Sequence, residues 1–266
     1  MIRTIAIANQ KGGVGKTTTA VNLSASMAAH QRRVLLIDVD PQGNATMGAG
    51  INKNGIEQSV YTVLLGEAGL IDARVKAQGG FDLIPANREL AGAEIEMVSM
   101  PDRETKLKDA IHTLKAAIDA VADQYDYIFI DCPPTLNLLT LNALCAADSV
   151  LIPMQCEYYA LEGLSDLVQT LRKLQQQLNP DLVIEGLLRT MYDNRMSLSQ
   201  QVAAQLEQHF GDKLFKTVIP RNVRLAEAPS HGLPALLLDK ASKGAQAYMA
   251  LAEELIAKHE VAVTHG

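Results

Sequence analysis

The chain has 266 residues, of which 48% are hydrophobic and 20% charged, and its formal net charge is −6. It can bury a sizeable core, but no stretch approaches the roughly 20 apolar residues of a membrane span. The net charge by itself argues against nucleic-acid binding, although a local basic patch can outweigh it. The cysteines (Cys132, Cys145 and Cys156) show neither metal spacing nor a disulfide pattern, and the sequence enters a predicted strand at once. We therefore expect a cytoplasmic protein with reduced thiols and no signal peptide.

Short apolar runs alternate with helical periods along the chain. The runs are rich in Val, Ile and Leu, which is typical of strands buried on both faces of a parallel sheet. They are Ile2–Ala8, Val34–Asp38, Phe81–Pro85, Tyr127–Asp131, Ser149–Met154, Leu182–Met191 and Phe215–Ile219. Apolar residues three and four apart predict helices over Leu107–Val121, Leu161–Leu178 and about Gly244–Lys258.

This alternation predicts an α/β fold with a doubly wound, mostly parallel sheet flanked by helices on both faces. In such folds, ligands bind at the carboxyl ends of the strands. No linker, repeat or low-complexity tract interrupts the pattern. We therefore predict a single domain over residues 1–266, with a frayed tail from about residue 260.

The most informative segment is residues 9–19, Asn-Gln-Lys-Gly-Gly-Val-Gly-Lys-Thr-Thr-Thr, between the first predicted strand and a predicted helix. This order is typical of a phosphate-binding P-loop, in which backbone N–H groups surround the phosphates at a helix N-terminus. We expect Lys16 between the β- and γ-phosphates, Thr17 on Mg²⁺ and Thr18 near the α-phosphate. The predicted loop residues are Lys11, Gly12, Gly13, Val14, Gly15, Lys16, Thr17 and Thr18.

The loop departs from the usual P-loop pattern at two positions. Gln10 stands where the pattern has its first glycine, and a second lysine, Lys11, precedes Lys16. Lys11 has no obvious phosphate to meet within one subunit. We therefore predict that it reaches the nucleotide of another subunit.

Acidic residues follow two of the predicted strands. Asp38 and Asp40 end the second strand, and strand alternation places them on the same side. Asp131 follows four apolar residues in Tyr-Ile-Phe-Ile-Asp, a pattern whose aspartate acts on Mg²⁺. These carboxylates predict a nucleotide site with bound magnesium, while the sequence leaves the individual roles of Asp38 and Asp40 open.

Several further segments complete a recognisable pattern. They are Leu-Ile-Asp-Val-Asp-Pro-Gln-Gly-Asn-Ala-Thr, Leu-Ala-Gly-Ala-Glu-Ile-Glu, Ile-Asp-Cys-Pro-Pro, Gln-Cys-Glu-Tyr-Tyr-Ala-Leu-Glu-Gly-Leu and Val-Ile-Pro-Arg-Asn-Val-Arg-Leu-Ala-Glu-Ala-Pro-Ser-His-Gly. With the P-loop, they resemble the ParA/Soj family of chromosome- and plasmid-partitioning ATPases, which carry a deviant Walker A motif. The resemblance covers nearly the whole chain.

The resemblance implies a Mg²⁺-dependent ATPase of weak intrinsic activity that forms an ATP-sandwich homodimer. Lys11 would neutralise charge on the partner's phosphates, much as an arginine finger does. Gly12 would lie at the subunit contact, where a side chain would clash. Asp40 would position or activate the attacking water with support from Asp38, and Thr17, Asp131 and Asp40 would hold the metal.

The same resemblance implies further nucleotide contacts. Adenine is expected near Pro220 and Asn222, and Glu157 is expected to reach the ribose of the partner's nucleotide. A proline or asparagine in a loop is also a common turn former, so the residues alone leave both readings open.

A basic patch is predicted in the last third of the chain, where residues 189–246 hold eight Lys or Arg against five Asp or Glu. Arg195 and Arg224 match family positions implicated in non-specific DNA binding by the ATP dimer. Arg221, Lys240 and Lys243 are added on charge alone, since basic side chains bind phosphate backbones without regard to sequence. The resemblance further implies a ParB/Spo0J-type partner that stimulates hydrolysis, and a nucleoid-associated location.

The residues disfavour three alternative functions. A MinD-like, membrane-associated division-site ATPase is disfavoured, because the sequence ends without a basic amphipathic helix. A nitrogenase-reductase-like protein would use cysteines to bridge an iron–sulfur cluster, whereas Cys132 and Cys145 fit an apolar core. A metabolic ligase or kinase would show a second constellation for an acceptor substrate. His112, His209 and His231 are not grouped with other catalytic candidates.

Overall fold

The computed structural model of the chain describes residues 2–118 and 125–264. Within them, a seven-stranded sheet has the order β3-β4-β2-β5-β1-β6-β7. Every neighbouring pair is parallel except β3 with β4. The strands are β1 (Arg3–Ile7), β2 (Val34–Asp38), β3 (Val75–Lys76), β4 (Asp82–Ile84), β5 (Tyr127–Asp131), β6 (Ser149–Gln155) and β7 (Val183–Thr190). The predicted doubly wound, mostly parallel sheet is thereby confirmed.

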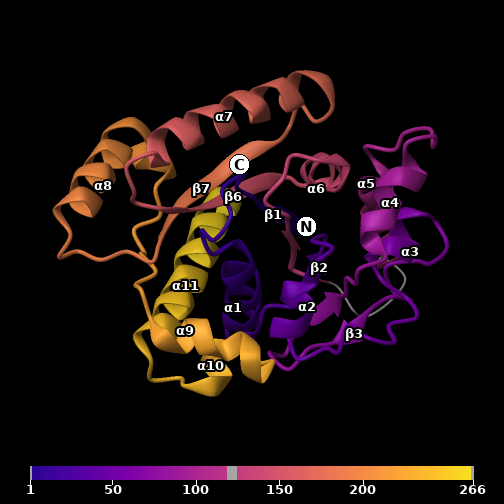
Figure 1. The fold of residues 1–266 in the computed structure, drawn as a ribbon, viewed down its shortest axis with the longest axis horizontal. Helices are drawn as coiled ribbons and strands as arrows, with labels where there is room; N and C mark the ends of the chain where they lie inside the picture. Colours follow the sequence, from indigo (N-terminus) through magenta and orange to yellow (C-terminus); the bar gives the residue numbers. More distant parts are fainter. Residues whose placement is uncertain (1, 119–124, 265–266) are drawn as a thin grey trace.

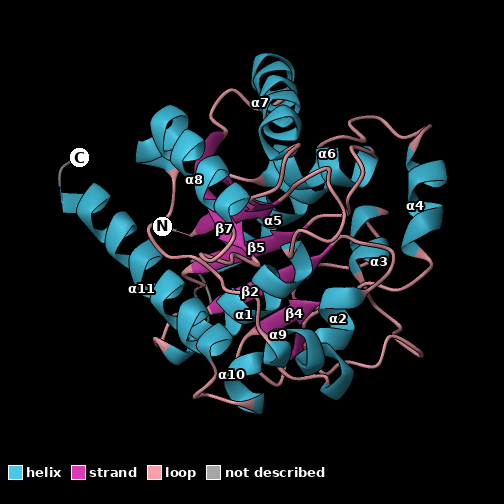
Figure 2. Ribbon diagram, turned by 60° about the vertical axis from the view of Figure 1, so that its left-hand side comes forward, coloured by secondary structure: helices cyan, strands magenta, loops and turns pink. Residues whose placement is uncertain are grey.

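Helices cover both faces of the sheet, and Figure 2 shows the strands enclosed between them. They are α1 (Lys16–Ala29), α2 (Asn44–Gly48), α3 (Val60–Leu64), α4 (Leu90–Met97), α5 (Lys106–Ile118), α6 (Leu138–Ala146), α7 (Ala160–Gln177), α8 (Ser197–Phe210), α9 (Val223–Glu227), α10 (Ala235–Leu238) and α11 (Lys243–Thr264). Short 3₁₀ helices cover Gly211–Lys213 and Ala228–His231.

The strand alternation divides the core into two layers. In β1, the side chains of Ile5 and Ile7 pack with α1 and α11, while that of Ala6 packs on the opposite face with α5, α6 and α7. Figure 1 shows α11 lying beside α1 although they occupy opposite ends of the chain. Their contact includes a buried hydrogen bond between the hydroxyls of Thr19 and Tyr248, 3.0 Å apart. The two faces are therefore both buried, as the continuous apolar strands predicted.

One predicted strand is wrong. Phe215–Ile219 is an extended segment that makes only isolated bridges on either side, Leu187 with Leu214 and Tyr192 with Pro220. Side chains take several of its backbone groups: Arg189 donates to the carbonyl of Phe215, and Glu254 of α11 accepts from Lys216 and Thr217. The N–H groups of Phe215 and Ile219 still donate to carbonyls of β7, but side chains take the groups between them, so no continuous ladder with β7 forms. The short edge strand β3 was not predicted.

The helix ends also differ from the sequence prediction. The predicted Leu107–Val121 corresponds to α5, which ends at Ile118, and Val121 lies outside the described residues. Helix α7 ends at Gln177, and Leu178 is its C-cap. Helix α11 continues to Thr264, beyond the predicted Lys258 and through most of the tail expected to fray. In the described part of the chain, no helix has both the length and the apolar character needed to cross a membrane.

Candidate nucleotide-binding site

The P-loop connects β1 to α1 at the carboxyl edge of the sheet. Gly13 and Gly15 have φ angles of 73° and 87°. These left-handed conformations favour glycine, because a β-carbon would strain the backbone. Gly12 differs, since its φ is not in this region and a β-carbon there would meet nothing within 4 Å. Nothing within the described protomer therefore requires glycine at Gly12.

Lys16 occupies the first turn of α1 and is buried. Its Nζ donates to the carbonyl of Lys11 at 3.2 Å. Burial lowers the pKa of Lys16, and the negative charges of Asp131 and Asp40 oppose this effect. The lysine and both carboxylates therefore lie within electrostatic reach of one another.

Asp131 is the most conspicuous acid of the site. Its position at the end of β5 is paired with Ile7 on one side and Asp38 on the other, which places it beside the start of the P-loop. It is fully buried, and neither carboxylate oxygen makes a hydrogen bond of normal geometry with a described residue. Burial and the neighbouring Asp38 raise its pKa well above the usual value, while the Thr17 side chain favours the ionised form.

Asp38 and Asp40 have different surroundings. Asp38 is fully buried, and one oxygen accepts from the backbone N–H and hydroxyl of Thr46 at 2.8 and 2.7 Å. Its other oxygen accepts from the N–H of Asp40 at 3.2 Å. Burial raises the pKa of Asp38 to about 6 despite these hydrogen bonds. In Asp40, Oδ1 accepts from the N–H of Gln42 at 2.9 Å, and the side chain stays slightly exposed.

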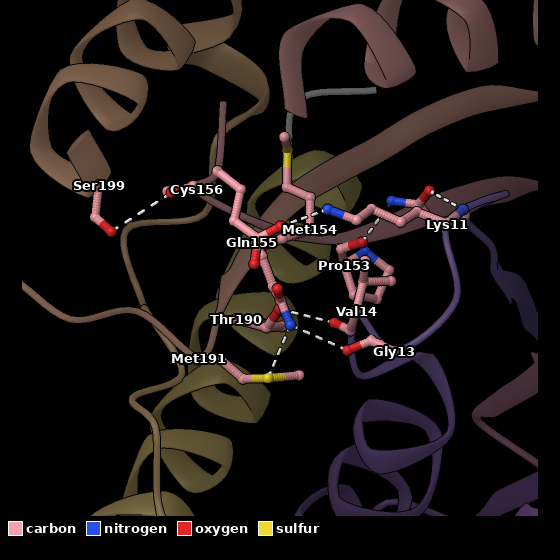
Figure 3. Close-up of polar contacts among 12 residues, drawn as sticks. Lys11, Gly13, Val14, Pro153, Met154, Gln155, Cys156, Thr190, Met191 and Ser199 are labelled. Atoms are coloured by element: carbon pink, nitrogen blue, oxygen red, sulfur yellow. Dashed lines mark hydrogen bonds and ion pairs between the residues drawn. The ribbon is translucent and has the colours of Figure 1, made fainter. Parts of the chain in front are cut away.

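The opposite side of the P-loop contacts the ends of β6 and β7 (Figure 3). Gln155 donates to the carbonyl of Gly13 at 3.0 Å, and the Thr190 hydroxyl donates to the carbonyl of Val14 at 2.7 Å. Asn9 anchors the start of the loop by donating to the carbonyl of Pro153 at 2.8 Å. The sequence prediction missed these residues. A polar residue ending an apolar strand was the available signal for Thr190, as it was for Asp131.

Lys11 and Glu157 contact each other. The Lys11 Nζ lies 2.5 Å from a Glu157 carboxylate oxygen, and both side chains are about half exposed, at 48% and 51%. Both residues were predicted to reach a nucleotide of the partner subunit. In the single protomer they form an ion pair with one another, so the Lys11 ammonium lies on the outer side of the loop.

The residues predicted near adenine have local structural roles as well. The Asn222 side chain caps α9 by accepting from the N–H of Leu225 at 3.3 Å. Pro220 bridges to Tyr192, the second residue after Thr190. Pro220 therefore lies on the segment next to the β7 end that contacts the P-loop, and its contact with adenine stays a prediction.

The basic residues predicted to bind DNA are exposed. Arg195, whose side chain is 86% exposed, pairs with Asp193 at 2.7 Å. Arg224 pairs with Glu227 at 2.9 Å and with Asp239 at 3.3 Å, and this second pair joins α9 to the segment that holds Lys240 and Lys243. The charge of Arg221 acts on Asp193, which places it near Arg195. Arg221 thus lies near Arg195, while Arg195 and Arg224 are each partly neutralised by acids.

The site has features that suit a divalent cation. Asp131 offers buried carboxylate oxygens that have no hydrogen-bond partner of normal geometry among the described residues, and such groups are commonly satisfied by an ion or ligand. No group of three or more His, Cys, Asp or Glu suited to holding a metal by itself occurs in the described ranges. Mg²⁺ is usually bound by one or two carboxylates together with phosphate oxygens. The donor set therefore fits magnesium that arrives with a nucleotide.

Comparisons with known proteins agree with this geometry. A family model described as an AAA domain matches residues 2–184. The chain is 56% identical to the sporulation initiation inhibitor protein Soj of Bacillus subtilis, over 97% of this chain and 99% of that protein. It is 52% identical to the chromosome partitioning protein ParA of Caulobacter vibrioides, over 97% of this chain and 95% of that protein.

Solved structures show the same architecture. Cobyrinic acid a,c-diamide synthase from Mycobacterium smegmatis with bound ADP and magnesium has a TM-score of 0.83 at 38% identity, covering 98% of this chain and 96% of that chain. The septum site-determining protein MinD of Pyrococcus horikoshii, complexed with Mg-ADP, has a TM-score of 0.75 at 29% identity and covers 96% of each chain.

The parallel sheet, the left-handed glycines before Lys16 and the strand-terminal aspartates define a P-loop ATPase of the ParA/MinD type. Soj and ParA proteins are more than 50% identical to the chain over nearly its whole length, so they identify one family within this class. The chain belongs to the ParA/Soj family of chromosome-partitioning ATPases.

Proposed function

We propose that the chain is an ATP-driven switch for DNA segregation. It binds ATP or ADP with Mg²⁺, closes into a sandwich homodimer with ATP, and binds DNA without sequence preference in that form. A ParB/Spo0J-type centromere-binding partner stimulates its slow hydrolysis, after which the dimer separates and leaves the DNA. This cycle places the protein on the nucleoid in the cytoplasm.

The main support for the proposed dimer comes from the exposed outer side of the P-loop. Gly12 is exposed, lacks a left-handed φ and has space for a side chain in the protomer. Lys11 points to Glu157 on this same exposed side. A glycine that the described protomer does not require, next to a half-exposed lysine, fits a surface that a second copy covers, where Lys11 exchanges Glu157 for the partner's phosphates.

Within the proposed nucleotide site, different residues of the protomer bind the phosphates, hold the metal and orient the attacking water. Lys16 and the loop amides of Gly12, Gly13, Val14 and Gly15 hold the phosphates, with Thr18 near the α-phosphate. Thr17, Asp131 and Asp40 would hold Mg²⁺, which when bound neutralises charge on the β- and γ-phosphates. Asp38 positions Asp40 and α2 through Thr46. Asp40 orients the attacking water, because its carboxylate is less committed to protein donors than that of Asp38.

The dimer is tested with Gly12→Val, which the protomer accommodates. The variant is expected to fold and to bind ADP, but to remain monomeric with ATP and Mg²⁺ in sedimentation velocity. Asp40→Ala is the matched control, since it is expected to hydrolyse no ATP and to accumulate as an ATP dimer. A Gly12→Val protein that dimerises like Asp40→Ala would refute this assignment of the loop.

DNA binding is proposed for Arg195, Arg221, Arg224, Lys240 and Lys243. Each protomer contributes a modest patch, and two linked patches bind more strongly than one. Introducing Asp40→Ala together with Arg195→Glu and Arg224→Glu is expected to keep the ATP dimer but lose DNA at low salt. Arg172→Glu with Lys173→Glu, on the exposed face of α7, is the control for charge alone. Equal retention of both charge variants on DNA would contradict the patch.

Two other functions are separated by simple assays. The similarity to MinD suggests a membrane-associated ATPase, which would sediment with anionic vesicles in the presence of ATP. The similarity to cobyrinic acid a,c-diamide synthase suggests an amide-forming enzyme, whose ATP turnover would rise with a carboxylate acceptor and an ammonia source. We expect turnover to rise only with DNA and the centromere-binding partner together.

A further inference from the structure

The P-loop carbonyls are held by two side chains from neighbouring strands. The Thr190 hydroxyl, 2% exposed at the end of β7, donates to the carbonyl of Val14 at 2.7 Å. Gln155, at the end of β6, donates from Nε2 to the carbonyl of Gly13 at 3.0 Å. Figure 3 shows both side chains directed at the same turn of the loop. Two successive carbonyls are therefore drawn toward the β6–β7 side.

Because the peptide bond is planar, fixing the carbonyls of Gly13 and Val14 also fixes the direction of the N–H groups of the residues that follow them. In a trans peptide, the carbonyl of one residue and the N–H of the following residue lie in one plane and point in opposite directions. The described chain has no cis peptide bond. Holding the carbonyls of Gly13 and Val14 therefore turns the N–H groups of Val14 and Gly15 away from β6 and β7. In the described residues, neither N–H donates a hydrogen bond of normal geometry.

The backbone beside Thr190 is strained in a way that serves the same contact. Met191 has a φ of 47°, which is uncommon for a residue other than glycine. In this conformation its Sδ accepts from Gln155 Nε2 at 2.9 Å, and its Cε lies 3.9 Å from the place of a β-carbon on Gly15. Strain of this kind persists where the surrounding structure requires it, often at functional sites.

The Thr190 hydroxyl has a second acceptor, the carbonyl of Met154, at 3.1 Å. A hydroxyl has one hydrogen, so it donates to one carbonyl at a time. The shorter distance favours Val14. Thr190 therefore ties the loop to the β6–β7 pair by a bond with an alternative partner nearby.

We propose that Thr190 and Gln155 are positioning residues that aim the N–H groups of Val14 and Gly15 at the nucleotide phosphates. They contact the loop carbonyls rather than the nucleotide, and they set the direction of two donors before any ligand binds. The inference rests on the proposed nucleotide site and adds to it the residues that orient its amides. Such preorganised donors bind a phosphate without the cost of reorienting the backbone.

The test measures ADP binding with Mg²⁺ by isothermal titration calorimetry. Thr190→Val keeps the shape but removes the donor, and is expected to weaken ADP binding about tenfold; Gln155→Leu, at a more exposed contact, is expected to weaken it about threefold. Thr190→Ser restores the hydroxyl and is expected to bind within about twofold of the wild type. The ³¹P resonance of the bound β-phosphate is expected to move toward its free position in Thr190→Val.

Thr4→Val is the matched control, because Thr4 is a fully buried strand threonine whose hydroxyl has no hydrogen-bond partner in the part of the chain that the structure describes. It is expected to keep the wild-type affinity and ³¹P shift. If Thr190→Val folds and binds ADP as the wild type does, the inference is overturned. If Thr190→Val does not fold, Gln155→Leu decides in the same way. A wild type that binds no ADP would overturn the proposed function itself, together with this inference.

Discussion

The two sides of β1 present opposite chemistry to the P-loop. On one side, the ends of β2 and β5 carry Asp38, Asp40 and Asp131, which we term the acid flank. On the other side, the ends of β6 and β7 carry Gln155 and Thr190, which we term the donor flank. The acid flank contains a buried carboxylate that makes no hydrogen bond of normal geometry within the described chain, and two acids with raised pKa values. The side chains of the donor flank make hydrogen bonds to the loop.

This contrast distinguishes groups that hold the site in shape, which we term the frame, from groups that are available to bind a ligand. A buried polar group that is paired stabilises the fold, whereas an unpaired one costs stability unless a ligand satisfies it. The donor flank therefore fixes the shape of the loop before ligand binds. The acid flank retains unfavourable electrostatics that a bound cation would relieve. The following predictions test this contrast, from the largest expected effect to the smallest.

The largest effect is expected at Lys16, which stands between the two flanks. Lys16→Ala removes an ammonium that interacts with the charges of Asp131 and Asp40 and that is expected to contact the phosphates. We expect ATP and ADP affinity to fall at least about a hundredfold, because charge-assisted hydrogen bonds are the strongest of their kind. Titration with a fluorescent ADP analogue measures this loss. An affinity of Lys16→Ala within tenfold of that of the wild type would contradict the assignment of Lys16 to the phosphate site.

Thr46→Val tests whether Asp38 belongs to the frame despite its place in the acid flank. The Thr46 hydroxyl donates to Asp38 and accepts from the N–H of Ala86 at 2.9 Å. Its loss leaves the buried Ala86 N–H without this partner and removes one of the three hydrogen bonds that Asp38 accepts. We expect the free energy of unfolding to fall by about 2–3 kcal/mol. Urea denaturation measures this change, with Thr4→Val as a control that removes a hydroxyl without a hydrogen-bond partner among residues 2–118 and 125–264. Equal stability of the two variants would contradict this role.

Asp131→Asn is expected to change stability and binding in opposite directions. The neutral amide replaces a fully buried carboxylate that makes no hydrogen bond of normal geometry with the described residues, so the nucleotide-free protein should become more stable by about 1–2 kcal/mol. The same change should weaken Mg²⁺-dependent binding of ATP. Thermal unfolding with and without Mg-ATP measures both effects. A variant that loses stability without ligand would show that the Asp131 charge is satisfied in the protein.

The smallest effect is a dependence of stability on pH. Burial raises the pKa of Asp38 to about 6 and that of Asp131 above its usual value, so folding favours their protonated forms. The free energy of unfolding without nucleotide should therefore rise by about 1 kcal/mol as the pH falls from about 7 to about 5. Asp38→Asn should flatten this rise. A wild-type profile that declines steadily over the same range would contradict the raised values.

Glu185 determines how the free energy of unfolding changes at the acidic end of this pH dependence. Burial alone would raise its pKa, but hydrogen bonds from His259, Lys258 and Ser149 lower it below the usual range. The stability that it contributes is present above its unfolded pKa of about 4.3, and is lost as the pH falls further toward the folded value. The wild type is therefore expected to be most stable near about pH 5. Glu185→Gln should lessen the decline on the acid side.

The sequence by itself predicted the P-loop between a strand and a helix and the aspartates of the acid flank. Apolar runs ending in Asp38 and Asp131 are a local pattern, and parallel strands necessarily bring such ends to one edge. Gly13 and Gly15 were likewise part of the predicted phosphate-binding loop, and the left-handed φ angles found there explain why glycine suits both positions. These features depend on residues close together in the chain, where composition and spacing carry the information.

Only the tertiary structure decided the donor flank. Thr190 and Val14 are 176 positions apart, and Lys11 and Glu157 are 146 apart, so no local spacing connects them. The extended Phe215–Ile219 segment failed as a strand for the same reason, since Arg189 and Glu254 from other elements take its backbone groups. Periodicity reports which face of an element is buried. It does not report which distant polar group satisfies a given carbonyl, and that pairing shaped the loop.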